Sequence, residues 1–279
     1  LESTHGLGFQ CSDTLSTVWH PRGLLWRNSK GTGWASSTVR KEHDKRQESL
    51  PTLETTMVPP CLLSLTLSDD RTALVKISGV DGHQRYISLL RLDPSPAEQK
   101  PMSPMIANDG WHIVREVVGG DAFSHGTPNN SFDSINKTLN KYLSIEHGGG
   151  SDDKVAALNI FAEEASLLSV GISPPDDPPT DWSAPAGSLL EISTKIYSDG
   201  VASQTPHLPE SKAHDVVVNI DVLNCQTAAS ATVHVGNGSQ THVFVDHILL
   251  GRSNTETDEW RILSKVFTPR VWPEQNKQF

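Results

Sequence analysis

The residues best suited to chemistry in this sequence lie on one face of a predicted strand near the C-terminus. In Gln240–Leu250, side chains two residues apart point to the same side, so His242, Phe244, Asp246 and Ile248 share a face. A carboxyl among apolar neighbours is desolvated, which raises its pKa and suits a general acid or base. We therefore predict Asp246 as the catalytic base, with His242 close enough to exchange protons with it.

Further candidates come from the helices and from the apolar neighbours of Asp246. Tyr142 could direct its hydroxyl to the site as an electrophile, and we predict ligand contacts from Phe244, Ile248, Phe161 and Tyr197. Another interpretation stays open for each polar candidate. A buried Asp can simply hold the fold through hydrogen bonds, and a Tyr on an apolar helix face is often a core residue.

The sequence predicts neither a metal site nor a cofactor site. Twelve histidines are present, but His234 and His242 flank Asn237-Gly238, and a two-residue hairpin would place them on opposite faces. No HExxH pattern or clustered His, Asp and Glu spacing is found. Serine-triad and P-loop signatures are also missing from the sequence, so we expect cofactor-independent chemistry.

The composition limits the classes of partner. The chain has 279 residues and a net charge of −10, which disfavours binding to nucleic acid or to an anionic membrane. No stretch approaches 18 consecutive apolar residues, so we expect a soluble protein with no membrane span. Its compartment is not indicated. The three cysteines, Cys11, Cys61 and Cys225, are too widely spaced for a disulfide framework.

The elements that must position these residues follow a helix-then-strand order. An apolar stripe from Phe132 to Leu143 predicts a first helix, which ends at Gly148-Gly149-Gly150. Val155 to Ala165 suggests a second helix, and Leu189–Tyr197 a short strand leading into a third. Period-two patterns then predict four strands, at Asp215–Leu223, Ala228–Val235, Gln240–Leu250 and Trp260–Phe267.

The same pattern occurs twice in the chain. The segment around Trp111 returns around Trp260, 149 residues later, and the segment around Trp19 returns around Phe161, 142 residues later. This domain-sized period predicts two copies, residues 1–124 and 125–279. The first helix of the first copy would begin before residue 1, so we expect it to be missing, cleaved or supplied by preceding sequence. Processing from a longer precursor would account for this.

The first copy repeats the four strands with a different candidate site. They are predicted at Leu62–Leu67, Thr72–Gly79, Arg85–Leu90 and Trp111–Val118, with a turn at Asp81-Gly82. The segment Tyr86–Leu90 is shorter than its counterpart and has neither Asp nor His. We therefore predict that any chemistry belongs to the second copy. We also expect Trp111 and Trp260 to take equivalent buried positions.

The order of elements and one phrase resemble a known family. Phe244-Val245-Asp246, followed by Glu259-Trp260-Arg261-Ile262 and Lys265-Val266-Phe267, resembles the SnoaL-like, "putative lumazine-binding" branch of the NTF2-like superfamily. Trp19-His20-Pro21 is similar to the family's Phe-His-Pro, whereas the second copy departs from it with Phe161-Ala162-Glu163.

The resemblance implies an α+β fold, a cone-shaped barrel in which a curved antiparallel sheet holds helices on its concave face around a pocket. Members usually dimerise through their sheets, so a tandem implies an intramolecular pseudo-dimer in which copy one packs on copy two. A larger assembly also stays open.

Two functions follow and both are kept. One is a cofactor-independent cyclase, isomerase or dehydratase that acts on an apolar, oxygenated small molecule. The other is a non-catalytic module for ligand binding or assembly. Whether the protein is an enzyme is left open, because the fold alone does not decide function.

Overall fold

The structure is a computed structural model that describes eleven segments of the chain. They are residues 19–28, 34–38, 61–79, 83–93, 110–119, 131–174, 179–206, 215–223, 226–236, 242–254 and 259–271. The chain divides into two compact units. The first comprises Leu1–Ser124, Val170–Leu190 and Leu223–Ala228, and the second comprises His125–Ser169, Glu191–Val222 and Ala229–Phe279.

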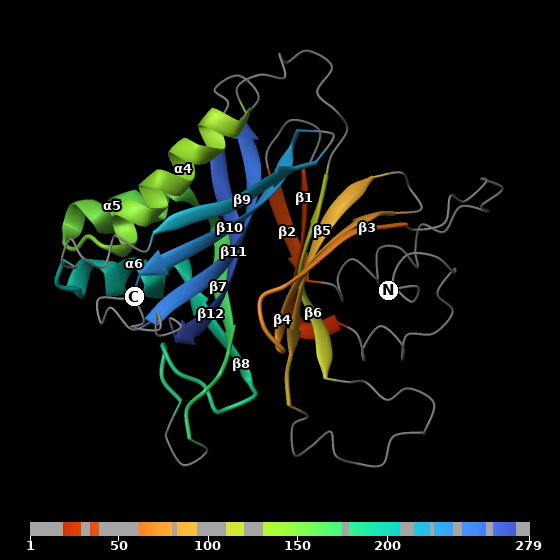
Figure 1. Cartoon of the computed structure of the whole chain (residues 1–279). Coiled ribbons are helices and arrows are strands. Elements are labelled where there is room, and N and C mark those ends of the chain that lie inside the picture. Colours follow the sequence, from red (N-terminus) through yellow and green to blue (C-terminus); the bar gives the residue numbers. More distant parts are fainter. Residues whose placement is uncertain are drawn as a thin grey trace, which may run out of the picture. The chain divides into compact units, whose positions relative to one another are not determined.

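The first half of the chain forms one six-stranded sheet (Figure 1). In spatial order its strands are β2 (Trp34–Thr38), β1 (Trp19–Asn28), β6 (Trp111–Val118), β5 (Gln84–Arg91), β4 (Thr72–Ser78) and β3 (Cys61–Leu67). Strands β1 and β6 pair in parallel, and the other neighbouring strands pair antiparallel. The sheet is therefore mixed, because β1 precedes the meander in sequence and pairs with its last strand.

The second half forms a sheet with the same order of equivalent strands. They are β8 (Leu189–Ser193), β7 (Phe161–Val170), β12 (Glu259–Val271), β11 (His242–Asn254), β10 (Ala228–Gly236) and β9 (Val216–Val222). Again the early strand, β7, pairs in parallel with the last strand, β12.

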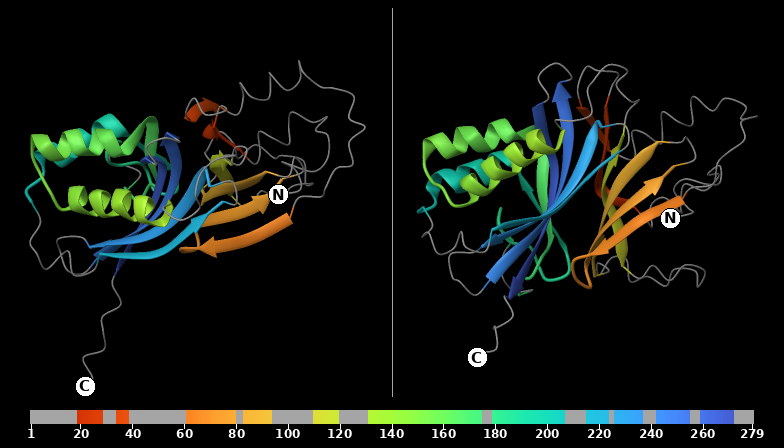
Figure 2. Two further views of the ribbon diagram at one scale, coloured as in Figure 1. Left: turned by 90° about the horizontal axis from the view of Figure 1, so that it is seen from above. Right: turned by 45° about the horizontal axis from the view of Figure 1, so that its top comes forward.

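Three helices lie together on one side of the second sheet, as both views of Figure 2 show. They are α4 (Ser131–Glu146), α5 (Ser151–Ile160) and α6 (Thr194–Ser203), and both α4 and α5 contact β12. The buried residues of α4 include Ile135, Leu139 and Tyr142 and follow the predicted stripe, since residues three and four apart share a helix face.

Local caps fix where α6 begins and how its end meets α4. The Ser193 hydroxyl accepts a hydrogen bond from the backbone N–H of Ile196, which satisfies an amide that has no partner within the helix. The Gln204 amide donates to the carbonyl oxygen of Gly148 at 2.6 Å, just beyond α4. The Gln204 contact holds the C-terminal ends of α4 and α6 together.

The two sheets match in register as well as in strand order. Arg91 pairs with Trp111 in the first sheet, and Arg252 pairs with Trp260 in the second. The register also shifts at equivalent points, between Ser88 and Leu89 on β5 and between Leu249 and Leu250 on β11. The offset of 149 residues holds for the last strands, and that of 142 for β1 and β7. The repeat seen in sequence is thus a repeat of structure.

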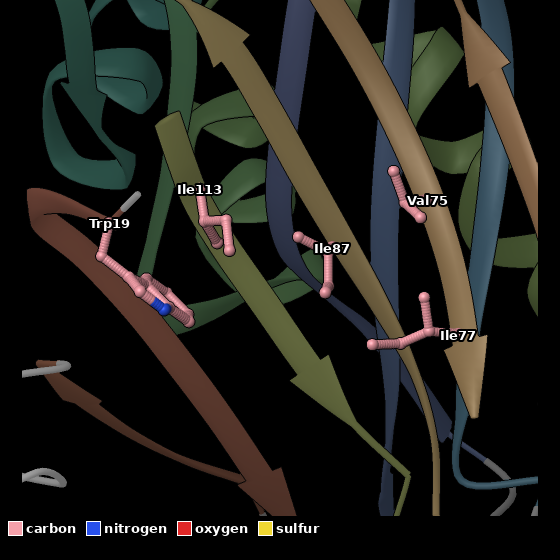
Figure 3. Close-up of a cluster of buried hydrophobic side chains, with 5 residues drawn as sticks. All are labelled: Trp19, Val75, Ile77, Ile87 and Ile113. Carbon is pink, nitrogen blue, oxygen red and sulfur yellow. The ribbon is translucent and has the colours of Figure 1, made fainter. Parts of the chain in front are cut away.

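One apolar cluster packs on a face of the first sheet (Figure 3). Its members come from four adjacent strands and are Trp19, Val75, Ile77, Ile87 and Ile113. The register makes Phe161 the counterpart of Trp19 and Ile262 the counterpart of Ile113. The same face of both sheets therefore carries a large aromatic residue at the start of the parallel strand.

The second predicted helix is too long, because α5 ends at Ile160 and Phe161 already begins β7. Trp260 is buried as predicted, but the equivalent Trp111 is only partly buried. The predicted turns at Asp81-Gly82 and Asn237-Gly238 lie outside the described residues.

Among the described helices, none is long and apolar enough to cross a membrane.

Candidate active site

Three polar side chains meet between α4 and the strands β11 and β12. The Tyr142 hydroxyl donates a hydrogen bond to Asp246 Oδ2 at 2.5 Å. The Lys265 ammonium donates to the Tyr142 oxygen at 2.5 Å and lies 3.3 Å from Asp246 Oδ2. Asp246 is 0% exposed and Tyr142 is also fully buried. The predicted base and its predicted tyrosine partner are therefore in direct contact.

Two more polar groups extend this cluster towards the end of α4. Lys265 Nζ donates to Glu146 Oε1 at 2.8 Å, and the Tyr197 hydroxyl donates to the same oxygen at 2.9 Å. Glu146 lies four residues after Tyr142, one helical turn along the same face. Its side chain is 19% exposed and is the most exposed of the five. We call these five residues, Tyr142, Glu146, Tyr197, Asp246 and Lys265, the polar cluster.

Aromatic side chains surround the polar cluster. The ring of Phe161 packs edge-on against Tyr142 and Tyr197, with ring centroids 6.4 Å and 5.4 Å away. Lys265 Nζ lies 5.4 Å from the centroid of Phe267, which itself packs against Phe244. Such contacts between a cation and aromatic rings help to compensate the ammonium for its lost hydration.

The remaining predicted ligand contact, Ile248, is buried on β11 opposite Lys265 in the strand register. His242 is the first residue of β11, but its side chain lies outside the described part of the structure. The structure thus brings Phe161, Tyr142 and Tyr197 together around Asp246 and leaves the position of the His242 imidazole undetermined.

Burial dominates the protonation of Asp246. Desolvation, together with the charge of Glu146, raises the pKa of Asp246 to about 6, against the opposing effects of Lys265 and the Tyr142 hydrogen bond. The Asp246 carboxyl is therefore poised to take up or release a proton near neutral pH. This is the property expected of a general acid or base.

The pKa values of the neighbouring groups are shifted away from neutrality. Burial lowers the pKa of Lys265, but the charges of Asp246 and Glu146 outweigh it and raise that pKa overall. Burial opposes the charge of Glu146, yet Lys265 lowers the Glu146 pKa below its usual value. Desolvation raises the pKa of both tyrosines well above 10. Asp246 is consequently the group in the polar cluster that titrates closest to neutrality.

One atom of the polar cluster has unused hydrogen-bonding capacity. Within the described part of the chain, Asp246 Oδ1 is buried and has no hydrogen-bond partner. A buried polar atom without a partner costs free energy, so a native one needs an explanation. A ligand that donates a hydrogen bond, or a carbon acid that gives up a proton, would supply the missing partner.

The equivalent positions of the first sheet carry the opposite charges. The strand register places Arg85 at the position of Asp246 and Glu116 at the position of Lys265. Arg85 donates to Glu116 at 3.0 Å, and both side chains are almost fully buried. The assignment of chemistry to the second copy was based on Tyr86–Leu90 as the counterpart segment. The counterpart of Asp246 is instead the preceding residue, Arg85.

Sequence reasoning missed Lys265 and Glu146. The signal for Lys265 is a lone cation inside the apolar run Ile262–Phe267, since a buried Lys requires a partner. The signal for Glu146 is its spacing of four residues from Tyr142. It is also an acidic residue in the last turn of α4, where the helix dipole disfavours negative charge. Both positions could have been singled out from these patterns.

No group of three or more His, Cys, Asp or Glu side chains that could hold a metal is found among the described residues. The donors in the polar cluster are instead two carboxyls, two phenols and an ammonium. This set suits hydrogen bonding and proton transfer at a small organic molecule.

Comparison with known protein families gives a match in the second half of the chain. Residues 130–268 match the model of the family described as "Putative lumazine-binding". No curated protein matches the chain.

Several solved structures are similar to part of the chain. An NTF2-like protein of unknown function from Shewanella baltica is 21% identical over 53% of this chain and 100% of its own, with a TM-score of 0.39. One from Silicibacter pomeroyi is 17% identical over 52% and 100%, with a TM-score of 0.37. A "putative ketosteroid isomerase" from Parabacteroides distasonis is 14% identical over 50% and 86%, with a TM-score of 0.31.

The family match covers the three helices and nearly all of the second sheet, including every residue of the polar cluster. The first sheet repeats the strand order and register of the second. The second half of the chain therefore matches the "Putative lumazine-binding" family, and the whole chain has an α+β architecture with two sheets of the same strand order in tandem.

Proposed function

We propose that the polar cluster binds an oxygenated small molecule and that Asp246 transfers a proton to or from it without a cofactor. The reaction would be an isomerisation, cyclisation or dehydration. The observation that carries this proposal is the state of Asp246: a fully buried carboxyl with a pKa of about 6 and one oxygen without a partner.

The surrounding groups support this chemistry. Lys265 is a fixed positive charge beside the carboxyl, and it stabilises negative charge that develops during proton transfer. Phe161 and the two tyrosines form a buried aromatic cluster beside Asp246, which keeps the surroundings of the carboxyl apolar. The description of the matched family points to a lumazine, a fused ring with several carbonyls, as the first ligand to try.

Two measurements test the proposal. The first is a fluorescence titration with lumazine, and the second follows ring opening of 5-nitrobenzisoxazole, a carbon acid that reports a positioned base. Asp246→Asn keeps the shape of the side chain and removes its basicity. It is expected to weaken lumazine binding about tenfold and to slow the ring opening about 10²-fold or more.

Arg85→Gln is the matched control, because Arg85 occupies the equivalent position in the first sheet. It should leave both signals unchanged. Ring opening that is equally fast in the wild type and in Asp246→Asn would exclude Asp246 as the base.

A second candidate function is non-catalytic ligand binding or assembly, in which the polar cluster only holds α4 and α6 to the sheet. It is favoured by the internal hydrogen bonds, since Glu146 Oε1 alone accepts from two cluster members. In this case Asp246→Asn lowers the free energy of unfolding by about 1–3 kcal/mol and changes neither signal. Packing of the first copy on the second, as an intramolecular pseudo-dimer, stays a prediction.

A further inference from the structure

A fully buried carboxyl that takes up or releases a proton to solvent must do so through neighbouring groups. Asp246 is 0% exposed, so water does not reach its carboxyl directly. The side chain of Glu146 is 19% exposed, which makes it the point of contact between the polar cluster and solvent.

The hydrogen bonds between these two carboxyls form an unbroken series. Lys265 lies 2.8 Å from Glu146 Oε1 and donates to the Tyr142 oxygen at 2.5 Å, and Tyr142 donates to Asp246 Oδ2 at 2.5 Å. The last two donors point inwards, towards Asp246. Each link is short enough for a proton to pass along it without movement of the backbone.

We propose that Glu146, Lys265 and Tyr142 form a proton relay that carries protons between solvent and Asp246. This inference rests on the proposed role of Asp246 and names residues that act through others, none of which needs to touch the substrate. It also gives Glu146 a reason to occupy the last turn of α4, where the helix dipole disfavours a carboxylate.

The transfer balances at every link. When the Asp246 carboxylate is protonated, the Tyr142 O–H bond breaks and a new O–H bond forms at Asp246 Oδ2. The Tyr142 oxygen receives a proton from the Lys265 ammonium, and the Lys265 amine receives one from the carboxyl of Glu146, which water has protonated. Tyr142 and Lys265 end as they began, and the reverse sequence returns the proton to solvent.

The charged and titratable groups that face this path come from every element around it. Glu146 and Tyr142 lie on α4, Tyr197 on α6, Asp246 on β11 and Lys265 on β12. Tyr197 donates to Glu146 Oε1 but makes no bond to the next link. It lies off the relay but helps to lower the pKa of Glu146, so the control is taken from the first sheet.

The test measures how fast Asp246 is protonated, with no substrate present. A flash-released proton is followed by time-resolved infrared absorption of the protonated Asp246 carboxyl, a band identified by its loss in Asp246→Asn. Glu146→Gln keeps an acceptor oxygen for Lys265 and Tyr197 but cannot carry the proton. We expect it to slow the protonation rate about tenfold or more, and Tyr142→Phe to do the same. Arg85→Gln, in the first sheet, should match the wild type.

A protonation rate in Glu146→Gln equal to that of the wild type would overturn the relay. If Glu146→Gln does not fold by circular dichroism, Tyr142→Phe decides, since it removes the oxygen and keeps the ring. Because no ligand is used, failure of the relay is distinct from failure of the proposed function. If the protein does not bind lumazine but Glu146→Gln slows the protonation of Asp246, the relay stands without the proposed function. If the protein binds lumazine but Glu146→Gln does not slow protonation, the proposed function stands without the relay.

Discussion

The two sheets place a buried ion pair at the same two positions, but they surround it differently. In the first sheet the pair is Arg85 with Glu116, one cation and one anion. In the second sheet Lys265 faces two carboxyls, Asp246 and Glu146. Burial raises the pKa of Asp246, and the charge of the second carboxyl, Glu146, raises it further. The proposed proton transfer would therefore distinguish the second pair from a purely structural one by the presence of one more acid.

The largest effect should come from removing the shared cation. Lys265→Met leaves two carboxyls facing each other without compensation and should lower the free energy of unfolding by about 3–5 kcal/mol. Arg85→Met leaves a single carboxylate and should cost less. Denaturant melts of both variants at neutral pH provide the comparison. If Lys265→Met lowers the free energy of unfolding less than Arg85→Met does, the additional carboxyl in the second sheet does not distinguish the two ion pairs.

The next effect concerns pH. Folding raises the pKa of Asp246 from about 3.8 to about 6, so the folded state binds the proton more tightly. Its stabilising contribution is complete below pH 3.8 and is lost as the pH rises through 6, a change of about 3 kcal/mol. Glu146 acts in the opposite sense, and its contribution is lost as the pH falls below 4.5. Between pH 4.5 and pH 6, the pH dependence of the unfolding free energy therefore comes mainly from Asp246.

Unfolding free energies measured from pH 4.5 to 6.5 test this. The difference between wild type and Asp246→Asn should shrink as the pH rises, because only the wild type loses the contribution of the Asp246 carboxyl. Parallel curves for wild type and Asp246→Asn would mean that the carboxyl is not desolvated as described.

The smallest effect concerns the two equivalent tryptophans. Trp260 is 2% exposed, whereas Trp111 is only partly buried. Trp260→Ala should therefore cost about 2 kcal/mol more than Trp111→Ala, because it leaves the larger cavity. Thermal melts of the two variants measure the difference. Equal losses would show that the last strands of both sheets are equally buried at their start.

Most of the fold could be predicted from sequence, because strands and helices carry local patterns. The last four strands of each sheet and the helix α4 follow from their periodicity. Strands β1 and β7 were not predicted, because they pair in parallel with partners far along the chain. Phe161 was assigned to a helix, since apolar residues at helical spacing precede it directly and no loop separates α5 from β7.

The candidate site was predictable in part, for a related reason. Alternation along β11 identified Asp246, and the stripe of α4 identified Tyr142, because both are local patterns. Their contact with Lys265 depends on the pairing of β11 with β12, which a single strand does not reveal. The swapped charges at Arg85 and Glu116 become visible only when the register of both sheets is known.

In both β5 and β11, a shift in register lies between the site residue, Arg85 or Asp246, and the loop that follows the strand. From Arg91 to Trp111 the chain advances 20 residues, whereas from Arg252 to Trp260 it advances 8, yet the paired positions are equivalent. The pairing register of the two strands therefore does not depend on the length of the loop that joins them. A designer could graft a longer loop between Arg252 and Trp260, for example to change which molecules gain entry, and still keep Asp246 facing Tyr142.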